Sequence, residues 1–108
     1  MGLVKGYRRN INQQFSIHIA ENTKKEEFQQ ILELNVSVHG EPVRDYINHV
    51  FLNHPRKEDV LFLYIKDSIS NKIVSSISLM PLVWGFGITT IPVCEMGFVG
   101  TLEKYRGK

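Results

Sequence analysis

The sequence lacks most of the features that mark specialised protein classes. Its 108 residues include one cysteine, and the formal net charge is only +2. Because Cys94 is alone, no intramolecular disulfide can form, which fits a reducing compartment. No apolar run approaches the roughly 18 residues of a membrane-spanning helix. The N-terminal MGLVKGYRRN also lacks the apolar centre of a secretory signal. We therefore expect a cytoplasmic protein without a membrane partner.

The charge pattern gives little support for nucleic-acid binding. DNA-binding domains usually carry a dense basic face, whereas the local basic cluster here is limited to Lys5, Arg8 and Arg9. We interpret residues 1–14 as a basic, flexible N-terminal arm, with phosphate contact as the less common alternative. The four histidines do not combine with Cys or carboxylates at metal-ligand spacing, so no metal is expected.

Residues 15–108 predict one mixed domain with two helices between strands. FSIHIA at 15–20 alternates apolar and polar residues, as a half-buried strand does. Thr23 and Glu26 form a capping box at the start of a helix. Gly40 ends that helix, and a second helix is expected to begin at Pro42 and to end at Pro55.

The second half of the chain predicts three strands. VLFLYIK at 60–66 is nearly all apolar, which is typical of a strand buried on both faces. Strands are also expected over 73–85, with a bend or bulge at Pro81, and over 91–100. Because their connections are short, they favour an antiparallel meander. The predicted class is α+β, with the order β-α-α-β-β-β.

The last segment, EMGFVGTLEKYRGK, resembles the fourth strand and following loop of the GCN5-related N-acetyltransferase (GNAT) superfamily. That loop opens with Arg or Gln and continues x-x-Gly-x-Gly/Ala into a helix; here Arg106 takes the first position. The predicted order of elements also matches the N-terminal half of this acyl-CoA N-acyltransferase fold. The resemblance covers nearly all of this chain but about half of a family domain, because the sequence stops within the pyrophosphate loop.

The resemblance implies transfer of an acetyl group from acetyl-CoA, as co-substrate, to a primary amine of unknown identity. By resemblance, six residues would contact the coenzyme: Val99, Gly100 and Thr101 at the pantetheine arm, and Arg106, Gly107 and Lys108 at the pyrophosphate. Backbone amides at a helix N-terminus bind anions, and glycine allows close approach. The 108-residue chain alone is expected to be inactive, because the general acid and the rest of the coenzyme site belong to the other half.

Glu95 is the candidate catalytic base. Strand alternation places it on one face with Val93, Gly97 and Val99, and Phe98 on the other. A carboxylate on an apolar strand is unfavourable unless it is paired or functional. Burial would favour a general base working near neutral pH, and some family members use an acidic residue at this position. An ion pair with a neighbouring Lys or Arg explains Glu95 equally well.

Other residues carry weaker hypotheses. His39 and Glu41 are expected in the loop between the helices, which commonly lines the acceptor pocket in this family, although helix capping and solvent exposure explain them as well. Cys94 could be an acyl-carrying nucleophile, but a buried structural thiol is favoured. Trp84 is expected to pack in the core or in a hairpin.

Two alternative functions come from other classes. One is a non-catalytic, PAS-like sensory module, whose five-stranded sheet would hold a small ligand beneath helices. The other is an acetyltransferase-like fold used only for protein association. Exposed edges at the first and last strands would invite pairing with a second copy, so a homo-oligomer is expected.

Overall fold

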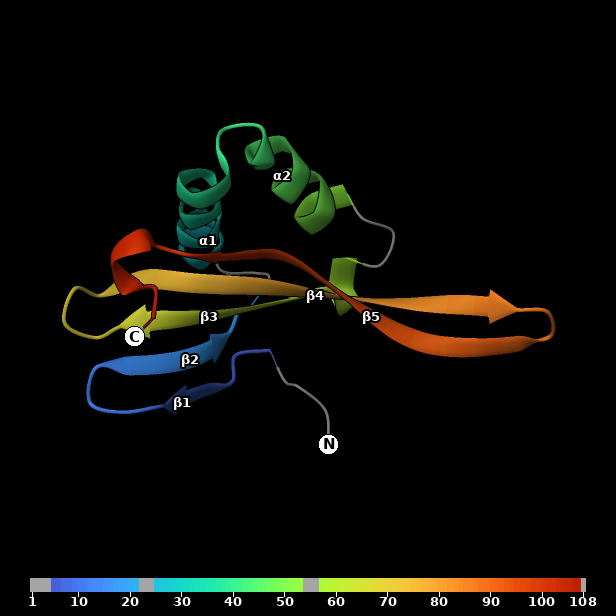
Figure 1. Ribbon diagram of the computed structural model, residues 1–108, viewed down its shortest axis with the longest axis horizontal. Helices are drawn as coiled ribbons and strands as arrows, with labels where there is room; N and C mark the ends of the chain where they lie inside the picture. The colour runs from blue at the N-terminus through green and yellow to red at the C-terminus, as the bar shows by residue number, and fades with distance from the viewer. Residues whose placement is uncertain (1–4, 22–24, 54–56, 108) are drawn as a thin grey trace.

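The computed structural model describes residues 5–21, 25–53 and 57–107, which form one sheet with both helices above it (Figure 1). The sheet has five antiparallel strands, in spatial order β1 (Arg8–Asn10), β2 (Phe15–Ile19), β3 (Leu61–Asp67), β4 (Lys72–Phe86) and β5 (Thr89–Thr101). The helices are α1 (Lys25–His39) and α2 (Val43–Asn53), with short 3₁₀ turns η1 (Lys57–Asp59) and η2 (Glu103–Tyr105). The predicted α+β class is confirmed.

The structure adds a strand that the sequence did not predict. β1 lies within the expected flexible arm and pairs with β2, with Arg8 opposite His18. The turn between them is closed by Asn12, whose Oδ1 accepts the backbone amide of Phe15 at 2.8 Å. Residues 8–10 of the expected arm therefore belong to the sheet.

α1 ends as predicted. Gly40 has φ 96° and donates its amide to the Val36 carbonyl at 2.8 Å, which is a left-handed helix cap. α2 begins directly after Pro42. The predicted capping residue Thr23 and the predicted helix end at Pro55 lie outside the described residues. No helix in the described ranges has the length and apolar character needed to cross a membrane.

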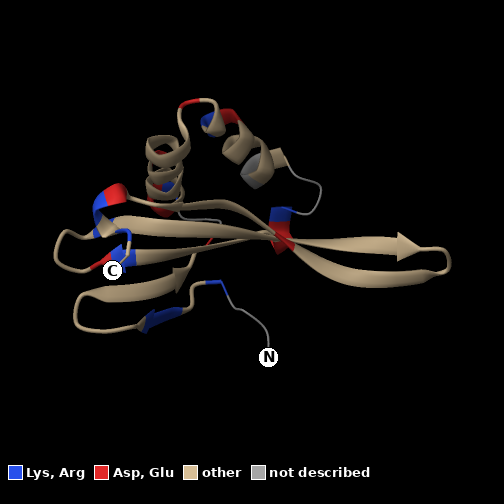
Figure 2. Ribbon diagram, viewed as in Figure 1, with Lys and Arg blue, Asp and Glu red and all other residues tan. Residues whose placement is uncertain are grey.

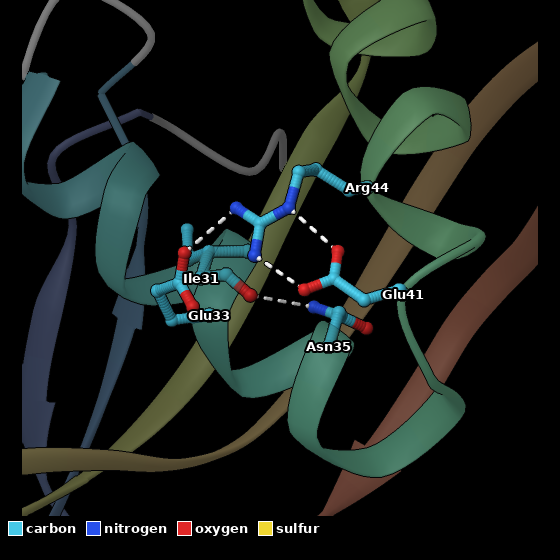
Figure 3. Close-up of polar contacts among 5 residues, drawn as sticks. All are labelled: Ile31, Glu33, Asn35, Glu41 and Arg44. Carbon is cyan, nitrogen blue, oxygen red and sulfur yellow. Dashed lines mark hydrogen bonds and ion pairs between the residues drawn. The ribbon is translucent and has the colours of Figure 1, made fainter.

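One guanidinium joins the two helices (Figure 3). Arg44 of α2 donates to Glu33 of α1 at 2.8 Å and to Glu41, just before α2, at 3.0 Å. All three groups are near the surface, so the contribution of these ion pairs to stability is modest. These contacts link α1 to the first turn of α2.

The core fills the layer between the helices and the sheet. Ile31 of α1, Ile47 of α2 and Phe62 of β3 each have 0% of their surface exposed. Burying such a side chain stabilises the fold by about 1.5–3 kcal/mol. The expectation that β3 is buried on both faces is wrong for the described residues: Leu63 and Ile65 are only half-buried, because the helices cover one face.

β4 and β5 form a hairpin that extends well beyond the helices (Figure 1). The last residue pair between β3 and β4 is Leu61 with Leu79, so the outer hairpin has two strands only. Pro81 lies just past this point, where its missing amide deprives no neighbouring strand of a donor, and β4 continues through it to Phe86. Gly87, with φ 61°, occupies the hairpin turn.

Candidate functional site

The C-terminal half of β5 carries a β-bulge. The register shifts between Ser76 and Ser78 of β4, so that Phe98 and Val99 of β5 lie opposite a single residue. Phe98 has φ 48°, which is uncommon for a bulky residue. A bulge interrupts the ladder of backbone hydrogen bonds and redirects the side chains that follow it.

The bulge corrects the faces assigned from alternation. Phe98 points toward the helices, where its ring stacks on Phe62 with centroids 6.4 Å apart. Val99 lines a groove of about 270 Å³ with Ile77 on the opposite face. The expectation that Glu95 and Val99 share a face, with Phe98 on the other, is therefore wrong. One inserted residue reverses the alternation for everything after it.

Gly100 is buried against the end of α1. A Cβ at this position would lie 3.1 Å from Cγ1 of Val38 and 3.3 Å from Nε2 of His39. Glycine therefore allows β5 to pass close beneath the helix. The structure brings together two residues that were predicted for different parts of the site, Gly100 for the coenzyme and His39 for the acceptor. His39 is exposed, and it is the last residue of α1 rather than a loop residue.

The chain turns back on itself after β5. Leu102 donates its amide to Val74 of β4 at 2.8 Å. Because successive backbone groups alternate in direction, those of Thr101 point away from β4. Arg106 donates from Nε to the Thr101 carbonyl at 3.2 Å. Gly107 has φ 78°, and a Cβ there would meet no atom within 4 Å.

Thr101, Arg106 and Gly107 therefore meet at one corner of the sheet. They contribute to a groove of about 440 Å³ on the face opposite the helices. Lys108, predicted for the same group, lies outside the described residues.

Serine side chains of β4 hold the bulged part of β5. Ser78 donates its hydroxyl to the Gly97 carbonyl at 2.8 Å, and Ser75 donates to the Gly100 carbonyl at 3.1 Å. The carbonyls on both sides of the bulge thus have partners, which limits the cost of the interrupted ladder. These serines were not predicted as functional, although serines within an apolar strand were a visible signal.

Asn35 extends this support to α1. Its side chain is fully buried, and its Nδ2 donates to the Ile31 carbonyl at 2.8 Å (Figure 3) and to Ser76 Oγ at 3.1 Å. The Asn35 Oδ1 has no hydrogen-bond partner among the described residues. α1 and β4 are therefore fixed to each other by polar contacts directly beside the bulge.

Glu95 lies before the bulge, opposite Met80 of β4. Its side chain is exposed, so the expected burial on a central strand is wrong for the described residues. β5 is the last strand of the sheet, and Glu95 pairs with Met80 just beyond the last residue pair between β3 and β4, at the base of the two-stranded hairpin. The alternative ion pair is also not formed within the described ranges.

The remaining candidates lie apart from one another. Glu41 is held by Arg44, whose hydrogen bond lowers the pKa of the Glu41 carboxyl. Cys94 is exposed on the hairpin, which contradicts a buried thiol. Trp84 was expected to pack in the core or in a hairpin. It lies on the hairpin, and 56% of its surface is exposed. Within the described ranges, no three His, Cys, Asp or Glu side chains cluster as metal ligands.

A second polar cluster lies on β2, β3 and α1. Tyr64 donates its hydroxyl to Glu27, which also accepts the backbone amide of Glu21 at 2.7 Å. The His18 ring stacks on Tyr64 with centroids 4.8 Å apart. Burial, followed by the charge of Arg8, lowers the pKa of His18, and burial and Glu27 raise that of Tyr64. The sequence analysis did not identify this cluster.

Comparison with known proteins gives results at the level of structure only. No protein-family model matches the sequence, and no curated protein sequence matches it. Among solved structures, N-myristoyltransferase of Saccharomyces cerevisiae with bound myristoyl-CoA has a TM-score of 0.69 and 18% identity over 96% of this chain. Glucosamine-6-phosphate N-acetyltransferase of Arabidopsis thaliana has a TM-score of 0.60 and 20% identity over 88% of this chain.

A third similar structure is a conserved protein of Enterococcus faecalis V583, described as a probable N-acyltransferase, with a TM-score of 0.61 and 17% identity over 85% of this chain. The chain spans 26%, 65% and 22% of the yeast, plant and bacterial proteins, respectively. At these identities the similarity shows the fold. The chain has the GNAT acyltransferase fold, and the order of its elements is consistent with the N-terminal half, as the resemblance predicted.

Proposed function

We propose that this chain is the N-terminal half of a domain that transfers an acetyl group from acetyl-CoA to a primary amine. The observation that carries the proposal is the bulged end of β5, where Gly100 passes beneath α1. The similar solved structures support it, because they are named as N-acyltransferases and the yeast protein holds myristoyl-CoA. We propose an acetyl donor because the plant structure is named as an N-acetyltransferase. The acceptor is proposed only as a primary amine.

The residues present fit the amide-rich arm of a coenzyme A thioester. β5 lies at the edge of the described sheet, with the backbone groups of Thr101 directed outward. Gly107 leaves open space around a left-handed backbone, which suits close approach by a phosphate. Arg106 supplies a cation that is tethered to the strand end. Val99, Gly100 and Lys108 complete the proposed coenzyme contacts.

Acetyl-CoA supplies an acyl group activated as a thioester. The chain would orient the amine so that a C–N bond forms as the C–S bond breaks and coenzyme A leaves as its thiolate. The attacking nitrogen must lose one proton, and Glu95 is the proposed acceptor. Glu95 lies on the same strand as the proposed coenzyme residues and would take this proton directly or through a water. His39 and Glu41, at the α1–α2 corner, form the proposed acceptor side.

The sensory alternative shares the five-stranded sheet but needs ligand space beneath the helices. Ile31, Leu32 and Phe62 fill that layer, and each is at most 2% exposed. The geometry therefore favours a site at the end of β5. Association through the edges of β1 and β5 remains a separate proposal.

Coenzyme A binding can be mapped directly on the 108-residue chain. Titration of the ¹⁵N-labelled protein with coenzyme A should shift the backbone amides of Val99–Thr101, Arg106 and Gly107. ADP, which lacks the pantetheine arm, should affect Arg106 and Gly107 without affecting Val99–Thr101. A Gly100→Val variant that is folded, as judged by its spectrum, should lose the strand shifts. Unchanged β5 amides at millimolar coenzyme A would contradict the proposal.

A further inference from the structure

The outer part of the β4–β5 hairpin is a two-stranded ribbon, formed by residues 80–86 and 89–95. An isolated hairpin of this kind is marginally stable in water. The turn at Gly87 matches a type II′ hairpin, whose twist suits the strands it joins. The sheet anchors the base of the ribbon, and its outer part extends beyond the body of the molecule (Figure 1).

One face of this ribbon is strongly apolar. Residues directly opposite in an antiparallel pair share a face, and Trp84 pairs with Ile91 while Leu82 pairs with Val93. With Phe86, these residues form what we call the ribbon face: Leu82, Trp84, Phe86, Ile91 and Val93. The ribbon face continues the side of β4 on which Met80 packs against the core. Nearer α1 this side is covered by helices, whereas Trp84 and Phe86 are 56% and 58% exposed.

Apart from Glu95 at its base, opposite Met80, the ribbon is also uncharged. No Lys, Arg, His, Asp or Glu occurs between Lys72 and Glu95, and Figure 2 shows the projecting strands without basic or acidic residues. A partner that carries charge would lose hydration without gaining an ion pair. An anionic membrane surface is recognised by basic clusters, which this segment does not have. The complementary surface is therefore neutral and apolar.

A second copy of the chain supplies such a surface. Two identical faces related by a two-fold axis are self-complementary, and two apolar sheet faces pack against each other about 10 Å apart. Covering both copies would bury on the order of 1,000 Å², which is the lower range for a specific interface. We propose that this chain forms a dimer through its ribbon faces, with Trp84 and Phe86 at the centre. This proposal does not depend on the proposed acyl transfer.

A matched pair of substitutions tests whether the chain dimerises and whether it does so through the ribbon face. Trp84 and the neighbouring Val83 are similarly exposed, at 56% and 59%, but they point to opposite sides of the ribbon. Each interface residue occurs twice in a two-fold dimer, so Trp84→Glu should weaken dimerisation by roughly 100-fold or more. Val83→Glu, on the other face, should leave the dissociation constant within a few-fold of wild type. Sedimentation equilibrium gives both constants, and circular dichroism confirms that both variants are folded.

The single tryptophan provides an independent readout. Trp84 emission should shift to shorter wavelength as protein concentration passes through the dissociation constant. A wild-type monomer at all concentrations would overturn the proposal. Equal disruption by both substitutions, or dimers unaffected by either, would also overturn it and would point to pairing through a strand edge. A blue shift that requires neutral lipid vesicles and occurs without self-association would assign the ribbon to a membrane instead.

Discussion

Replacing Gly100 by alanine tests whether the close passage of β5 beneath α1 is built into the fold. The new Cβ would lie 3.1 Å from Val38 Cγ1 and 3.3 Å from His39 Nε2. Favourable carbon contacts occur at about 3.5–4.0 Å, so α1 or β5 must move by a few tenths of an ångström. Overpacking of this kind costs about 1–3 kcal/mol. Gly100 is not in the left-handed region, so alanine recovers about 0.4–1 kcal/mol from the unfolded chain. We expect a net loss of about 1–2 kcal/mol.

Urea unfolding at fixed protein concentration measures this loss as a shift of the midpoint at unchanged slope. Gly85→Ala is the matched control, because it lies on the same hairpin, outside the left-handed region, with no atom within 4 Å of its Cβ position. Without a clash, it should gain only the unfolded-chain contribution and stabilise the protein by about 0.4–1 kcal/mol. Adding His39→Ala to Gly100→Ala should recover part of the loss, since the two sites are in contact. Equal stability of the two alanine variants would refute the reasoning.

Two pH predictions follow from the polar contacts. The Tyr105 hydroxyl, 2.5 Å from Asp67, lowers the pKa of that carboxyl. The resulting stability is present above the unfolded value of about 3.9 and is lost as pH falls through the native pKa. Tyr105→Phe should therefore lower the melting temperature most near neutral pH, and the difference should shrink in acid. Burial lowers the pKa of His18, so wild type should lose stability as pH falls below about 6.5. His18→Phe should remove this dependence, and melts between pH 5 and 8 check it.

Local signals in the sequence were sufficient for most of the elements. Gly40 and Pro42 marked the boundary between the helices, because a left-handed cap and a missing amide act within a few residues. The two hairpin strands were found from their β-forming residues. β1 was missed because Arg8–Asn10 has no apolar alternation. Its pairing with β2 is a tertiary effect that the segment itself does not encode.

The candidate site was predicted less well. Its geometry depends on the pairing register of β5 and on which parts of the β4–β5 hairpin are covered by other elements. The bulge at Phe98 reverses the side-chain alternation, and alternation was the basis for assigning faces. Gly97 and Gly100, on either side, were an available signal, since glycine within a strand often marks a bulge. Glu95 and Cys94 were expected to be buried from the apolar character of their strand. Cys94 lies on the side of the hairpin opposite the helices, and Glu95 lies where β3 no longer flanks β4; sequence periodicity reports neither.

Phe98 connects the core to the proposed coenzyme strand, and its backbone makes this connection testable. A φ of 48° costs a non-glycine residue about 1–2 kcal/mol, and the stacking on Phe62 offsets that cost. Phe98→Ala loses the stacking but keeps the strained backbone, whereas Phe98→Gly loses the stacking and relieves the strain. Glycine normally makes a strand less stable than alanine by about 0.5–1 kcal/mol. At this position we expect the opposite order, with Phe98→Gly more stable than Phe98→Ala in urea unfolding. The ordinary order would show that the bulge carries no strain and that Phe98 acts through packing alone.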